Sequence, residues 1–61
     1  MKSRTMTVTF HHTESGWKEE KTVTCLFTDA NTAYVITKVF VVELNTSLVF
    51  DKETNEFLVP D

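Results

Sequence analysis

The chain has 61 residues, of which six are basic and nine acidic, and its formal net charge is −3 at pH 7. A chain of this length forms one domain, residues 1–61, and buries only about 60% of the surface that it exposes when unfolded. The negative charge argues against nucleic acid as a partner, because neutralisation of phosphates dominates such binding. The sequence contains no run of about 18 apolar residues, so we expect no membrane span.

The cysteine content and the first residues bear on the cellular compartment. Cys25 is the only cysteine of the sequence and cannot form an internal disulfide, which favours a reducing compartment. The first ten residues, MKSRTMTVTF, lack the apolar run of a signal peptide. We therefore expect a cytoplasmic protein, located in the host cytoplasm if it is viral.

Runs rich in Thr, Val and Phe alternate with turn residues along the sequence, as is typical of β-strands. The five predicted strands cover residues 5–11, 18–28, 33–44, 48–51 and 56–59. Each of them contains one of the five phenylalanines, which predicts a core layer: Phe10, Phe27, Phe40, Phe50 and Phe57. Tight closure of a barrel usually needs glycines or bulges, and Gly16 is the only glycine. The predicted fold is therefore an all-β, antiparallel five-stranded meander, open or partly curled.

The first predicted hairpin allows two registers. A three-residue loop places Met6, Val8 and Phe10 on the second face of the sheet, whereas a four-residue loop places them on the first face, and the pattern leaves both open. Trp17 follows the glycine of this loop. An exposed tryptophan here anchors an interface, or the side chain folds back over the edge of the sheet.

The third segment, residues 33–44, is apolar on both alternating sets of side chains. Its β-branched and aromatic residues favour a strand. A helix capped by Asp29 or Asn31 is the alternative. For the strand, a four-residue loop before it pairs Cys25 with Ile36, and a three-residue loop after it pairs Leu44 with the fourth strand.

In the last predicted hairpin, a four-residue loop with Asn55 in the left-handed conformation places Phe50 opposite Phe57. Together the registers divide the apolar residues between two faces. The first face contains Val23, Cys25, Phe27, Tyr34, Ile36, Phe40, Val42, Leu44, Leu48, Phe50, Phe57 and Val59. The second face contains Leu26, Val35, Val39, Val41, Val49 and Leu58. Because one small sheet covers only one face, we expect the second face and Trp17 to form an interface with another chain.

Candidate chemistry is sparse. His11 and His12 are metal-ligand types, as are Glu14 and Cys25, but adjacent strand residues point to opposite faces. Cys25 lies among apolar residues, which predicts an inert thiol. No glycine-rich phosphate loop is present. The sequence therefore predicts no catalytic, metal or cofactor site, and we expect that the chain is not an enzyme.

The predicted function is that of a small non-catalytic protein-interaction module. It would act by homo-oligomerisation, as a dimer or a larger assembly, or by binding a host protein. Short acidic chains without catalytic groups are typical of accessory and inhibitor proteins of bacterial viruses and mobile elements. The alternative function is that of a small β-barrel module that binds nucleic acid or a short peptide.

Overall fold

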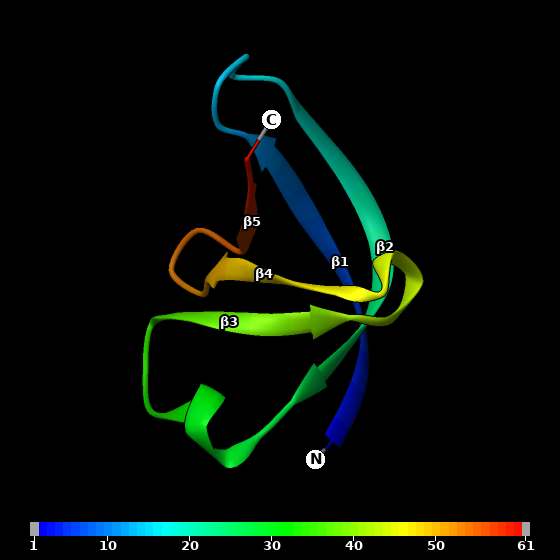
Figure 1. Cartoon of the computed structure of the whole chain (residues 1–61), viewed down its shortest axis with the longest axis vertical. Helices are drawn as coiled ribbons and strands as arrows, with labels where there is room; N and C mark the ends of the chain where they lie inside the picture. The colour runs from blue at the N-terminus through cyan, green and yellow to red at the C-terminus, as the bar shows by residue number, and fades with distance from the viewer. Residues whose placement is uncertain (1, 61) are drawn as a thin grey trace.

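Strands make up most of the computed structural model, which describes residues 2–60. In chain order the elements are β1 (Lys2–His12), β2 (Lys18–Phe27), the 3-10 helix η1 (Asp29–Thr32), β3 (Ile36–Val41), the 3-10 helix η2 (Val42–Leu44), β4 (Thr46–Asp51) and β5 (Glu56–Val59). β1 and β2 form a long twisted hairpin, and β3 and β4 run across it (Figure 1). The all-β class with five strands is confirmed.

The sheet closes into a small barrel in the order β1-β2-β3-β4-β5. Consecutive strands pair antiparallel, and β5 completes the barrel by pairing parallel to β1, from Thr9 opposite Glu56 to His12 opposite Val59. The prediction of an open or partly curled meander is therefore wrong. The sequence pattern carried no sign of the β1–β5 contact, because it joins segments that are far apart along the chain.

Closure does not depend on glycines within strands. The chain changes direction at η1 and η2 instead, and Asn45 and Asn55 adopt left-handed conformations with φ of 50° and 60°. Asparagine tolerates this region better than other non-glycine residues, because its short side chain bonds to nearby backbone. The barrel thus closes through sharp turns between strands, and not through the glycine bends or bulges within strands that closure was expected to need.

Two hairpins follow the sequence pattern. In the first, the N–H of His12 donates to the carbonyl of Trp17 at 2.8 Å, so residues 13–16 form a four-residue loop with Gly16 at φ 78°. Of the two registers left open, this one places Val8 on the same side as Val23. In the last hairpin Phe50 lies opposite Phe57, as predicted.

Strand β3 differs most from the prediction. It covers Ile36–Val41 only, and the residues after it form η2 rather than more strand; no α-helix forms within residues 2–60. Cys25 lies opposite Val41 instead of Ile36, so the register of β3 is shifted by a slide of five residues along the strand. The pairing with β4 is shifted by the same amount, and Val39 takes the place opposite Leu48 that was predicted for Leu44. Because five is odd, the slide turns every β3 side chain to the other face.

The slide reverses the predicted burial of β3. Val39 and Val41, expected on the second face, lie in the barrel interior with 1% and 0% of their surface exposed. Four residues expected on the first face are exposed: Tyr34, Ile36, Val42 and Leu44. Phe40 is half-buried on the outer surface. The pattern could not decide this, since both alternating sets of β3 side chains are apolar.

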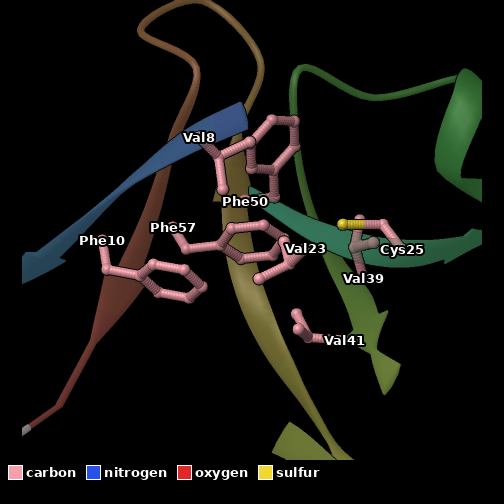
Figure 2. Close-up of a cluster of buried hydrophobic side chains, with 8 residues drawn as sticks. All are labelled: Val8, Phe10, Val23, Cys25, Val39, Val41, Phe50 and Phe57. Carbon is pink, nitrogen blue, oxygen red and sulfur yellow. The ribbon is translucent and has the colours of Figure 1, made fainter. Parts of the chain in front are cut away.

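The barrel interior is filled by eight buried residues, which Figure 2 shows: Val8, Phe10, Val23, Cys25, Val39, Val41, Phe50 and Phe57. The Phe57 ring lies 5.4 Å from that of Phe10 and 4.6 Å from that of Phe50, measured between ring centroids. Such pairs contribute about 0.5–1.5 kcal/mol beyond the burial of area. Of the five phenylalanines, these three are buried, and Phe27 packs against the cluster at its edge.

Asn31 joins β2 to β3 where the two strands diverge. The strands pair directly at two positions only. The Asn31 carbonyl oxygen accepts hydrogen bonds from the Thr28 N–H (2.7 Å) and hydroxyl (3.0 Å). Its amide nitrogen donates to the Lys38 carbonyl (2.8 Å) and to the Thr37 hydroxyl (3.1 Å). A buried polar side chain thus replaces the missing part of the ladder.

Candidate functional site

The first half of β1 has a free backbone edge. β5 pairs with β1 only from Thr9 onward, and within residues 2–60 no strand lies beside residues 2–7 on this side. The N–H groups of Thr9 and Thr13 donate to the carbonyls of Asn55 (3.3 Å) and Val59 (3.0 Å). Odd-numbered residues of β1 therefore direct their backbone groups away from β2, because these directions alternate along a strand.

It follows that Ser3, Thr5 and Thr7 direct backbone groups to this free side. The Thr7 carbonyl accepts a hydrogen bond from the Asn55 side-chain nitrogen at 3.2 Å. The backbone groups of Ser3 and Thr5 have no strand partner there among the described residues. We call residues 2–7 the β1 edge. It offers the row of donors and acceptors on which another strand can add.

A pocket of about 300 Å³ borders the β1 edge. It lies among β1, the end of β2, η1, the end of β4 and the turn that follows it. Its apolar walls are Met6, Phe27 and Phe50, and its polar lining residues are Arg4, Thr32, Lys52 and Asn55. Ligand pockets span about 300–1,000 Å³, so this one accommodates a side chain or a small group. We call it the Arg4–Lys52 pocket.

Two cations give this pocket its charge. The Arg4 guanidinium carbon lies 5.4 Å from the centroid of the Phe27 ring, within the range of a cation–π contact. The Lys52 ammonium donates a hydrogen bond to the backbone carbonyl of Asn31. Neither cation forms an ion pair with a carboxylate in the part of the chain that the structure describes. The pocket is therefore positive in a chain that is negative overall.

Two other basic residues, Lys18 and Lys21, are neutralised by carboxylates. Lys18 lies 3.1 Å from Glu56, and Lys21 lies 3.3 Å from Glu19. These pairs lie near the other end of the β1–β2 hairpin, away from the lining of the Arg4–Lys52 pocket. Pairing of this kind removes a lysine from the set of charges that attract a partner.

The predicted interface residues do not form one surface. Val39 and Val41 lie in the barrel interior, so the prediction of a second apolar face that includes them is wrong. Leu26, Val49 and Leu58 are half-buried on the outside of the barrel. Trp17 and Val35 are exposed, at 57% and 53% of their surface. The closed barrel covers its own core and therefore needs less cover from another chain than the open sheet would.

An outer groove of about 360 Å³ crosses β2, β3 and β4. Leu26 and Phe40, which pair across β2 and β3, form its apolar part. The other residues that line it are Thr28, Asn31, Lys38 and Ser47. Its surface is mostly apolar, and Lys38 is the only charged residue among the described residues that line it. The groove contains one predicted interface residue, Leu26.

The two adjacent histidines contact different carboxylates. His11 lies 3.6 Å from Glu56 on β5, and His12 lies 3.3 Å from Glu19 on β2. The His12 ring stacks on Trp17 with a centroid distance of 4.8 Å, so Trp17 folds back onto the hairpin while staying exposed. Within residues 2–60, no group of three His, Cys, Asp or Glu side chains is placed to hold a metal ion.

Cys25 is fully buried in the core. Burial raises the pKa of its thiol, and the nearby Glu43 carboxylate adds to this effect. The thiolate, which is the nucleophilic form, is thus disfavoured. Glu43 itself accepts a hydrogen bond from the Thr24 N–H at 2.8 Å, and this contact holds the pKa of the Glu43 carboxyl below its ordinary value. Both residues have contacts typical of structural roles.

No protein-family model, curated protein or solved structure matches this chain. A functional assignment thus depends on the geometry and charge of the residues themselves. Among residues 2–60, no helix has the length and apolar character needed to cross a membrane.

Sequence reasoning missed the Arg4–Lys52 pocket. Neither Arg4 nor Lys52 was among the residues predicted to form a site. One signal was present: alternation along β1 places Arg4 and Met6 on the same side as Val8, facing the core. The partner Lys52 could not be found, because it reaches the pocket through contacts of the turn after β4 with the β2–β3 connection, at Asn31 and Val35.

Proposed function

We propose that the chain is a small, non-catalytic protein-interaction module that binds an extended segment of another polypeptide along the β1 edge. The observation that carries this proposal is the set of backbone groups at Ser3 and Thr5 that have no strand partner within residues 2–60, next to a pocket with apolar walls. A segment that adds as a strand gains main-chain hydrogen bonds from the edge and specificity from the pocket. An inhibitor or accessory protein of a virus or mobile element can act through such a contact.

The two free edges of the β1–β2 hairpin differ in a way that favours β1. On its β3 side, β2 has no strand partner before Cys25 within residues 2–60, and residues 18–21 there are all charged. Charges of this kind normally prevent strand addition at an edge. Of the six residues of the β1 edge, only Lys2 and Arg4 are charged. The β1 edge is therefore the less protected of the two.

Charge also indicates that the partner of this edge is a different polypeptide. β1 contains Lys2 and Arg4 but no acidic residue. A two-fold pairing of β1 with a second copy would bring the cations of both copies together without a compensating carboxylate. Like charges across paired strands are destabilising. We therefore assign the β1 edge to another polypeptide and not to a homodimer.

A second candidate function has one observation in its favour. Tyr34, Val35 and Ile36 are consecutive, large, apolar and exposed. Such groups occur at protein interfaces. Native mass spectrometry of the purified chain tests homo-oligomerisation through this segment directly: a monomer at micromolar concentration contradicts it.

The proposal is tested with Thr5→Pro. The Thr5 N–H faces the free edge and takes no part in pairing with β2, so proline removes a donor from the edge only. Thr22→Pro is the matched control, because the backbone groups of Thr22 face the free side of β2. This variant also loses one exposed contact, between the hydroxyl groups of Thr22 and Thr7 (3.0 Å). Circular dichroism checks that both variants fold.

Binding is measured against a displayed library of random ten-residue peptides, selected on the wild-type chain. We expect selection of peptides rich in β-forming residues, at least tenfold weaker binding by Thr5→Pro, and unchanged binding by Thr22→Pro. If Thr5→Pro does not fold, a synthetic chain with N-methylated Thr5 replaces it. Failure to select any peptide, or equal binding by both variants, contradicts the proposal.

A further inference from the structure

The charge of the Arg4–Lys52 pocket identifies the kind of segment that binds beside it. We infer that this segment carries an acidic side chain, Asp or Glu, that binds in the Arg4–Lys52 pocket. The inference rests on the proposed function, since it assigns the chemistry of the partner at that site. It adds a residue-level specificity that strand addition alone does not have.

The first support is the state of the two cations. Arg4 and Lys52 have no carboxylate partner within residues 2–60, although acidic residues outnumber basic ones in this chain. Glu56 and Glu19 instead neutralise lysines elsewhere on the barrel. A partner carboxylate is the complement that the pocket lacks, and complementary charge favours both the rate of association and the choice of partner.

The second support is the way in which the cations are held. The Arg4 guanidinium contacts the Phe27 ring, an arrangement that leaves its N–H groups available for a carboxylate. Lys52 uses one N–H for the Asn31 carbonyl and keeps the others. That contact also restrains the lysine side chain, so less conformational entropy is lost when a carboxylate binds.

The third support is strand geometry. The side chains of Arg4 and Met6 face the pocket, and cross-strand neighbours share a face. A residue of the added strand that lies opposite one of these two residues thus directs its side chain to the pocket. The β1 edge continues beyond the pocket on both sides, at Ser3 and at Thr7. An added strand that uses the whole edge extends past the pocket in both directions, and the acidic group that it places there is then a side chain and not a chain end.

The experiment uses one peptide from the selection on the wild-type chain and its counterpart with the acidic residue replaced by the matching amide. Both are labelled, and binding is measured by fluorescence anisotropy against Arg4→Gln, Lys52→Gln and Lys38→Gln. Lys38 is the matched control, because it is an exposed lysine on the outer groove. A ten-nucleotide thymidine strand is a further probe.

We expect an Asp or Glu at a constant place in the selected peptides. Arg4→Gln and Lys52→Gln should each weaken binding of the acidic peptide about tenfold or more, with less than twofold change for the amide peptide. Lys38→Gln should leave both unchanged. If Lys52→Gln does not fold, Arg4→Gln decides the outcome, since Arg4 is exposed.

The outcomes separate this inference from the proposed function. Peptides without an acidic residue that still lose binding to Thr5→Pro overturn the inference and leave strand addition supported. Equal weakening of the acidic and amide peptides by Arg4→Gln overturns it too. Tighter binding of the thymidine strand than of any peptide overturns both, as does the absence of any selected peptide.

Discussion

Replacement of Asn31 by alanine tests the contact that joins β2 to β3. Asn31 is 7% exposed and its side chain forms four hydrogen bonds. Alanine removes all four and leaves the Thr28 N–H and the Lys38 carbonyl without these partners. Thr32→Ala is the matched control, because Thr32 lies in the same 3-10 helix, is exposed, and donates only to the Asp29 carbonyl (2.7 Å).

The size of the effect follows from the bonds. A typical hydrogen bond contributes a net ~0.5–1.5 kcal/mol to the free energy of unfolding. Water can replace the partners at the exposed Thr28 and compensate part of the loss, so we expect Asn31→Ala to lower the free energy of unfolding by about 2–4 kcal/mol. At ~0.05–0.15 kcal/mol per residue, the whole domain has about 3–9 kcal/mol. The variant therefore loses a large share of its stability.

Urea unfolding followed by circular dichroism measures this change. With a slope of about 1 kcal/mol per molar urea, typical of small domains, the midpoint falls by about 2–4 M. We expect Thr32→Ala to lower the free energy of unfolding by less than about 1 kcal/mol. A midpoint of Asn31→Ala equal to that of Thr32→Ala would show that the Asn31 side chain does not join the strands, and the reasoning would be refuted.

Two further predictions concern the β3 register and acid stability. Val39→Lys places a charge in the core and should abolish cooperative urea unfolding, whereas Phe40→Lys, on the outer surface, should keep it; the opposite result would restore the predicted register. The pKa of the Glu43 carboxyl is lowered from 4.5 in the folded state. Its contribution to the free energy of unfolding is therefore fully present above that pH and is lost as the pH falls through the folded-state pKa. In acid titrations, Glu43→Gln should remove this part of the pH dependence, and an unchanged profile would contradict it.

The last hairpin, whose register was predicted correctly, has a local signal. Asn55 fits the left-handed position of a four-residue turn, and this turn fixes Phe50 opposite Phe57. No comparable signal exists for β3, because both alternating sets of its side chains are apolar and its two connections contain 3-10 helices. A strand of this kind has no preferred face until the rest of the barrel surrounds it. Valines, and not Phe40, occupy the remaining interior beside the three phenylalanine rings.

The candidate site was less predictable than the fold. Arg4 and Phe27 are brought together by β1–β2 pairing, which sequence reasoning anticipated in outline. Lys52 joins them through contacts between the turn after β4 and the β2–β3 connection, where it bonds to Asn31 and Val35. Turn propensities and alternation describe neighbours in sequence and carry no information on such contacts.

The parallel pairing of β1 with β5 has a consequence for how the molecule folds. It joins residues 9–12 to residues 56–59, so the contacts close a loop that contains most of the chain. Contacts at such long sequence separation slow folding, because the entropy of loop closure is lost before they stabilise the chain. A single hairpin is marginal in water. We therefore expect one slow, all-or-none folding transition, in which Phe57 reaches its place between Phe10 and Phe50 as the strands come together.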